Sequence, residues 1–261
     1  MKRGITYIAL AYLWSWSWWI PLALSGAVTR PGQAWPTHLP GLLGPAVAAI
    51  LTAGYYDGIS GVRALWNRIA RVRVHWAWYV IIAVTASMIA LPFALGSDVE
   101  VADLTIYSGA GQLGLATVLY VLLLNGFGEE IGWRGYLADR MLEGHSLLDA
   151  AVRIWVVWGL WHLPLFLVVQ NFRDLGVGGA IGWALGLLSG SIWLTWMYRE
   201  SGASIAVVAL WHTAFNFATA TAAGAGVPAA VASTVVMIAS VVIALRRSSR
   251  TLEPGSGPGV S

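Results

Sequence analysis

The sequence predicts an all-α membrane protein of about eight transmembrane helices, with a polar cavity inside the membrane that faces the cytoplasm. Apolar residues fill 58% of the 261 positions and charged residues only 10%, and the mean hydropathy is +0.70. A water-soluble domain of this length could not hide so much apolar surface, because a soluble globule must cover itself with polar groups. The sixteen tryptophans indicate the same class, since indoles favour the interface between lipid and water.

The composition also excludes several kinds of chemistry and one class of partner. There are no cysteines, which rules out disulfides, thiolate metal ligands and a cysteine nucleophile. A small excess of arginine gives a sequence pI of about 9.4, which is too weak a signal to indicate nucleic-acid binding. The expected surroundings are therefore membrane lipid, with no nucleic-acid partner.

Eight apolar stretches are long enough, or nearly so, to cross a bilayer as helices. They cover residues 5–24, 39–56, 76–95, 112–128, 154–170, 178–198, 204–222 and 228–245, and the fourth is expected to continue as a helix to residue 140. The first stretch is too long and too aromatic for a removable signal peptide. We therefore expect one polytopic domain over residues 1–250, with a motif-bearing core at about 115–220, and a disordered tail over 251–261.

The distribution of basic residues predicts the orientation. With eight spans both termini lie on one side, and that side carries all Lys and Arg residues except Arg30 and Arg173. The residues on the first side are Lys2, Arg3, Arg63, Arg68, Arg71, Arg73, Arg134, Arg140, Arg153, Arg199, Arg246, Arg247 and Arg250. Cytoplasmic segments carry the excess of positive charge. Both termini are thus expected in the cytoplasm, with the protein in the plasma membrane.

One glycine pattern predicts packing. Glycines recur every fourth residue along the sixth stretch, at Gly178, Gly182, Gly186 and Gly190. Small residues on one helix face let a neighbouring helix come close. We therefore expect this stripe to lie against another helix rather than to serve chemistry.

Ionisable side chains at membrane depth are costly and are functional candidates by default. Once loops and helix ends are set aside, the remaining candidates are Glu129, Glu130, Arg134, His162, His212 and the amide Asn216. Glu130 and Arg134 are four residues apart and can pair on one helix face. Glu129 points about 100° away, which leaves it free to act as a base. The competing interpretation is a charge cluster that reaches for water at a helix end.

The two histidines and the amide extend this pattern to two further helices. His162 follows Trp158 by one turn and precedes Pro164, whereas His212 and Asn216 are four apart on one face. Each could instead be an ordinary hydrogen-bonding residue between packed helices. Together, however, the candidates place a carboxylate, two imidazoles and an amide at one membrane depth on three helices. This combination favours a hydrolytic site.

The ordered motifs resemble those of a known family. They read Glu129-Glu130-Ile-Gly-Trp-Arg134, Trp158-Gly-Leu-Trp-His162 and His212-Thr-Ala-Phe-Asn216. This E-E-x-x-x-R, aromatic-x-x-x-H, H-x-x-x-N series is similar to that of the CPBP family, the CAAX-processing and bacteriocin-processing proteases, which include the type II CAAX prenyl endopeptidases. The resemblance implies an intramembrane endopeptidase, a hydrolase whose substrate is a peptide or a membrane-anchored, in some members lipidated, protein.

The resemblance also implies roles for the six residues. Glu129 would activate a water with help from His162, His212 and Asn216 would donate hydrogen bonds to the oxyanion, and Glu130 with Arg134 would position the Glu129 helix.

Two alternatives stay open at this point. In a metalloprotease, Glu129, His162 and His212 would bind Zn²⁺, whereas a metal-free glutamate mechanism uses the same residues without a cofactor. A member of another class, a non-proteolytic scaffold or a transporter, would use them as a proton relay.

Overall fold

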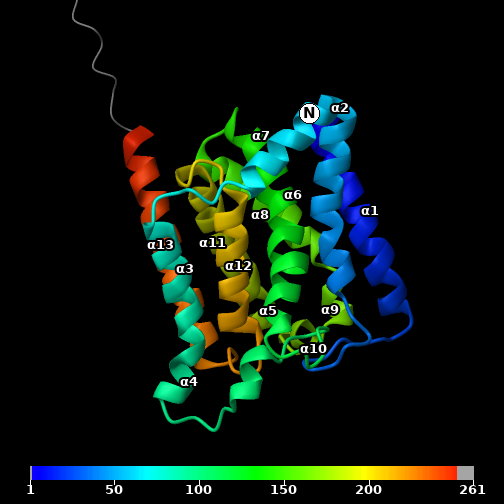
Figure 1. The fold of residues 1–261 in the computed structure, drawn as a ribbon, viewed down its shortest axis with the longest axis vertical. Helices are drawn as coiled ribbons and strands as arrows, with labels where there is room; N and C mark the ends of the chain where they lie inside the picture. Colours follow the sequence, from blue (N-terminus) through cyan, green and yellow to red (C-terminus); the bar gives the residue numbers. More distant parts are fainter. Residues whose placement is uncertain (1, 252–261) are drawn as a thin grey trace, which may run out of the picture.

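The computed structural model describes residues 2–251. The predicted tail therefore lies outside the described residues, except for Thr251. The described part is helical: it contains isolated β-bridges but no strand. Its long helices run side by side as a bundle, and the N-terminus and the end of the last helix lie at the same end of the bundle (Figure 1).

The predicted stretches all form helices, with shifted bounds. In chain order the structure has α1 (Lys2–Leu24), η1 (Leu39–Leu43), α2 (Gly44–Ile69), α3 (Ala77–Ser87), η2 (Met88–Ala90), α4 (Leu91–Ala94), η3 (Val101–Thr105), α5 (Ala116–Val121), η4 (Leu122–Phe127), α6 (Gly128–Gly132), η5 (Trp133–Ala138), α7 (Asp139–Leu142), α8 (Leu147–Trp161), α9 (Leu165–Val168), α10 (Gln170–Arg173), α11 (Gly176–Glu200), α12 (Ile205–Ala220) and α13 (Val227–Thr251).

Five segments within the described residues are long and apolar enough to cross a membrane. They are Leu39–Ile69, Ala77–Ala94, Leu147–Val168, Gly176–Glu200 and Val227–Arg247. Many large apolar side chains point outward from the bundle, including Leu13, Ile20, Leu119, Ile181, Leu185, Ile238 and Val241. Because water would penalise such a surface and lipid does not, the chain is an integral membrane protein, as predicted.

The helix that carries the first motif is continuous over residues 116–142, but it is widened twice. The stretches η4 and η5 have π-helical hydrogen bonding, one on each side of α6. Such widened turns are frequent at functional sites, because they re-aim the side chains that follow. The helix is also tightly packed: a Cβ on Gly126 would lie 2.8 Å from the carbonyl oxygen of Ala209, and one on Gly132 would lie 2.5 Å from the backbone of Pro45. These two glycines therefore let neighbouring backbones come close.

The helix that carries the second motif is shorter than predicted. The expected span of residues 154–170 is interrupted, because α8 ends at Trp161 and the chain turns before α9 begins at Leu165. Pro164 accounts for the break, since a proline lacks an N–H and disfavours helical geometry in the residue before it. His162 therefore lies at the C-terminus of a helix rather than within one.

The two ends of the bundle differ in character. The end with the start of α1 and the end of α13, here called the basic end, also contains the turns around residues 70–76, 143–146 and 201–204 (Figure 1). The opposite end, the loop end, is formed by the segments 25–38, 95–115, 162–175 and 221–226. Backbone hydrogen bonds join all four of these loops: Thr29 N–H donates to Val168 O, Gly32 N–H to Tyr107 O, and Ala222 N–H to Ile106 O.

Candidate active site

The two adjacent glutamates have different environments, although both are buried. An Oε1 atom of Glu130 accepts hydrogen bonds from Arg134 Nη1 at 2.8 Å and from His212 Nδ1 at 2.7 Å. Glu130 and Arg134 are both fully buried, so the interpretation as a charge cluster reaching for water at a helix end is wrong. Arg134 also stacks over the ring of Trp158 at 4.4 Å, which adds a cation–π contact. The predicted pair therefore forms inside the bundle.

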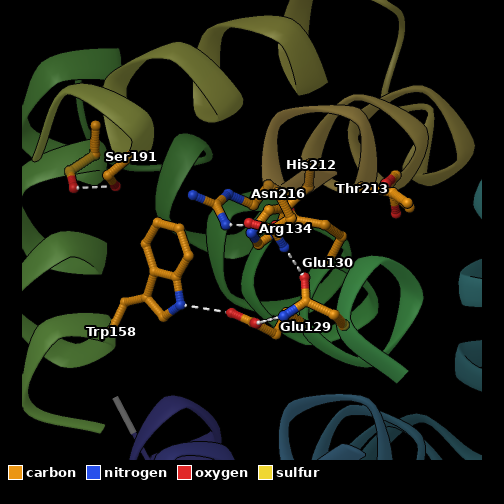
Figure 2. A network of polar contacts seen from close by, with 11 residues as sticks. Glu129, Glu130, Arg134, Trp158, Ser191, His212, Thr213 and Asn216 are labelled. Atoms are coloured by element: carbon orange, nitrogen blue, oxygen red, sulfur yellow. Dashed lines mark hydrogen bonds and ion pairs between the residues drawn. The ribbon is translucent and has the colours of Figure 1, made fainter. Parts of the chain in front are cut away.

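Glu129 has neutral donors as its hydrogen-bond partners. Its Oε1 accepts from Asn125 Nδ2 at 3.1 Å, and its Oε2 accepts from Trp158 Nε1 at 2.8 Å. Figure 2 shows the indole N–H of Trp158 directed at this carboxylate. Within the described chain, no cation forms an ion pair with Glu129. A carboxylate held by neutral donors keeps its capacity to accept a proton.

Each of the two histidines is held through its own Nδ1 atom. Nδ1 of His162 lies 2.6 Å from the carbonyl oxygen of Trp158, and Nδ1 of His212 lies 2.7 Å from Glu130. Because both partners are acceptors, each Nδ1 carries the proton that it donates. Each ring is therefore fixed by one nitrogen, and Nε2 is left for another partner.

Asn125 is a residue that the sequence analysis missed. It lies one turn before Glu129, and its Oδ1 accepts a hydrogen bond from Nδ2 of Asn216. Asn125 therefore connects the first and third motifs directly. The available signal was its spacing, since a residue four positions before Glu129 shares the same helix face.

His38 was also missed, because it belongs to a loop. It is 7% exposed and lines the same cavity, and its Nδ1 finds no hydrogen-bond partner among the described residues. Burial lowers the pKa of His38 to about 4, and His162 contributes in the same direction. The ring of His38 is consequently neutral at neutral pH. Local periodicity could not reveal this residue, since the loop reaches the site through tertiary contacts alone.

The motif residues meet at one cavity of about 510 Å³. Glu129, His162, His212 and Asn216 all line it, whereas Glu130 and Arg134 lie behind its wall. The structure therefore brings together the residues that were predicted to converge. Their roles in a reaction remain predictions.

The glycine stripe has a different position from the one expected. A Cβ on Gly178, Gly182, Gly186 or Gly190 would meet nothing within 4 Å, and three of these glycines, Gly182, Gly186 and Gly190, line the cavity. The prediction of close helix packing is therefore wrong. The four-residue repeat does form one helix face, but that face of α11 borders an open space towards α13 instead of another backbone.

The residues named as possible zinc ligands do not form a zinc site in this arrangement. Among residues 2–251, no three His, Cys, Asp or Glu side chains lie close enough together to hold a metal ion. Both carboxylate oxygens of Glu129 already accept hydrogen bonds from Asn125 and Trp158. A zinc ligand would have to give up at least one of them.

Comparison with known proteins supports the resemblance inferred from the motifs. The model of the type II CAAX prenyl endopeptidase Rce1-like family matches residues 111–218, a range that contains all three motifs. Over these residues the chain is similar to this family. The CAAX prenyl protease 2 of Methanococcus maripaludis is 24% identical over 213 residues, which cover 76% of this chain and 77% of the relative. The similarity thus extends well beyond the motifs, and the resemblance inferred from them is confirmed. These similarities support an endopeptidase, and hence an enzyme, of the CAAX-protease type.

Proposed function

We propose that this chain is an intramembrane endopeptidase in which Glu129 acts as the general base on a water molecule. The observation that supports this role is the difference between the two glutamates. Glu130 is committed to Arg134 and His212, whereas Glu129 lines the cavity with neutral donors as hydrogen-bond partners. Of the two carboxylates, Glu129 is therefore the one that can exchange a proton with a cavity water.

The proposed reaction assigns one proton path to Glu129. The carboxylate takes a proton from the water while the water oxygen bonds to the carbonyl carbon of the scissile peptide. The resulting tetrahedral oxyanion then collapses, the C–N bond breaks, and Glu129 returns its proton to the leaving amine. Nε2 of His162 orients the water as an acceptor, because Nδ1 of this ring already donates to Trp158.

Two donors are placed to stabilise the oxyanion. Asn216 uses one N–H on Asn125, which leaves its second N–H for the cavity. His212, whose Nδ1 is held by the carboxylate of Glu130, donates through Nε2 when its ring is protonated at both nitrogens. Fixed donors of this kind can each contribute about 3–4 kcal/mol to stabilising a transition state.

The proposed substrate is a peptide segment of a membrane-anchored protein. The name of the archaeal relative indicates a prenylated substrate for that protein. For this chain, a cavity that includes apolar and glycine-lined walls supports an apolar or lipid-anchored segment near the scissile bond.

The function is tested by comparing protein termini in host membranes that carry wild type or Glu129→Gln. New termini that appear with wild type alone are expected. Identical termini in both membranes, together with proton flux through purified wild type in liposomes, would instead support the transporter with a proton relay.

We further propose that α1, the helix of residues 116–142 and α12 complete an eight-span bundle in the plasma membrane with both termini in the cytoplasm. The scarcity of positive charge at the loop end supports this orientation, since only two of the fifteen Lys and Arg residues, Arg30 and Arg173, lie there.

The metal-free mechanism predicts resistance to chelation. Purified wild type is expected to keep its cleavage activity after prolonged treatment with a strong chelator and to contain no stoichiometric zinc by elemental analysis. The cleavage rate of the Glu129→Gln variant, measured in parallel, gives the background of the assay. Complete loss of activity that Zn²⁺ alone restores would instead assign Glu129, His162 and His212 as ligands.

A further inference from the structure

Two polar side chains from the loop end line the cavity but have no part in the proposed reaction. His38 is 7% exposed and Tyr107 is 6% exposed. Both lie outside residues 111–218, which the family model matches. Nε2 of His38 and Oη of Tyr107 form no hydrogen bond with the described residues, and neither is among the fully buried polar atoms. Because the remaining surface of both side chains faces the cavity, these two atoms are open to a ligand there.

The two loops that carry these residues pack against each other at the loop end (Figure 1). Gly109 N–H donates to the carbonyl oxygen of Arg30 at 3.4 Å, and a Cβ on Gly109 would lie 3.2 Å from Nδ1 of His38. The ring of Tyr107 stacks on Phe217 with centroids 6.1 Å apart. Both side chains are therefore held in place before a substrate arrives, which lowers the ordering cost of binding.

The two residues share the cavity with the candidate catalytic side chains, and both are uncharged at neutral pH. Burial raises the pKa of Tyr107, and the negative charge of Glu129 acts in the same direction. The ring of His38 is neutral for the reason given above, and His162 contributes to its lowered pKa. A phenol and a neutral imidazole can each donate or accept a hydrogen bond. The pair therefore offers two neutral, versatile partners beside Glu129 and His162.

The chemistry of the cavity favours an uncharged amide as the ligand. None of the described lining residues is Lys or Arg, and most are apolar or glycine. A carboxylate bound here would lack the cation that usually pairs with it. A peptide unit buried among such walls costs free energy unless its N–H and C=O find partners. A hydroxyl and an imidazole can supply both.

We propose that His38 and Tyr107 form a substrate-binding subsite that hydrogen-bonds the peptide unit next to the scissile bond. The proposal rests on the proposed function, in which His212 and Asn216 stabilise the oxyanion, and it assigns the neighbouring peptide unit to a different pair of residues. Contacts of this kind are made before and during the reaction alike. They increase the affinity for substrate rather than the rate of the chemical step.

The test measures binding and cleavage separately. Tyr107→Phe and His38→Phe each remove the polar atoms and keep a ring. The probe is an apolar peptide with a fluorescent label and an internal quencher. KM and kcat come from its cleavage, and Kd comes from its binding to the same variants in the Glu129→Gln background. The matched control is Tyr198→Phe, which removes a buried hydroxyl that donates to Asp139 at 3.0 Å outside the cavity.

Each Phe variant in the subsite is expected to raise KM and Kd about 2–10-fold, the effect of one hydrogen bond, while kcat stays near that of wild type. Melting temperatures should also stay near wild type, because neither Nε2 of His38 nor Oη of Tyr107 bonds within the described chain. His38→Gln, which again places an N–H near the position of Nε2, should restore most of the affinity. Tyr198→Phe should change neither constant.

Three results would overturn the subsite. They are a fall in kcat with unchanged Kd, which would place the pair in the chemical step, unchanged constants in both subsite variants, and an equal rise in Kd for Tyr198→Phe. Because Kd is measured on Glu129→Gln without cleavage, failure of the subsite is distinguishable from failure of the proposed protease activity. The latter would show as a probe that binds through His38 and Tyr107 but is not hydrolysed by wild type.

Discussion

Glu129→Gln is expected to reduce peptide cleavage to background while the protein expresses and melts nearly as wild type. Gln has the size of Glu but cannot take a proton from water at neutral pH. General-base catalysis contributes about 10²–10⁴-fold to a rate, so a loss of at least this size is expected. The measurement is a cleavage assay on the purified variant in detergent.

The small effect on stability follows from the partners of Glu129. Both carboxylate oxygens accept from donors, Asn125 and Trp158, and the Gln amide can satisfy only one of them. The lost hydrogen bond costs about 1 kcal/mol. Removing a charge from a nearly buried position offsets part of that cost.

The informative control is Trp158→Phe, which removes one donor to Glu129 and keeps a ring beside Arg134. It should lower activity less than Glu129→Gln, because the base itself remains. Substantial cleavage by Glu129→Gln would show that the base is another group and would remove the central assignment of the mechanism.

The sequence was sufficient to predict what depends on local spacing. Apolar stretches predicted the helices, and the four-residue spacing predicted the Glu130–Arg134 pair that the structure contains. The four-residue spacing of His212 and Asn216 likewise predicted that both lie on one helix face, and both line the cavity. These features depend on helix geometry, which a single sequence contains.

Features that depend on packing between distant segments could not be predicted in this way. The glycine stripe shows the limit: its spacing identifies a helix face, but it does not say whether a backbone or an open cavity lies opposite. His38 reaches the cavity because its loop folds across the loop end.

Glu130→Gln is expected to fail differently from Glu129→Gln, with a clear loss of thermal stability and some remaining activity. Glu130 accepts from both Arg134 and His212 through one oxygen. Arg134 has no exposed surface, and its Nε and Nη2 have no hydrogen-bond partner among the residues that the structure describes. Removing the one carboxylate that it contacts would leave a buried guanidinium without a counter-charge. Breaking a buried pair from one side costs about 3–5 kcal/mol.

A double variant separates this electrostatic cost from damage to packing. Replacing the pair by Glu130→Gln and Arg134→Met removes both charges and keeps side chains of similar length. Because an apolar replacement of a whole buried pair is often close to neutral in stability, the double variant should melt above Glu130→Gln alone. Melting curves and cleavage rates in detergent are measured side by side for wild type, Glu129→Gln, Glu130→Gln and the double variant. If Glu130→Gln melts as wild type, the pair does not hold the Glu129 helix. If it is as inactive as Glu129→Gln while remaining folded, Glu130 takes part in proton transfer, and the division of roles between the two glutamates is wrong.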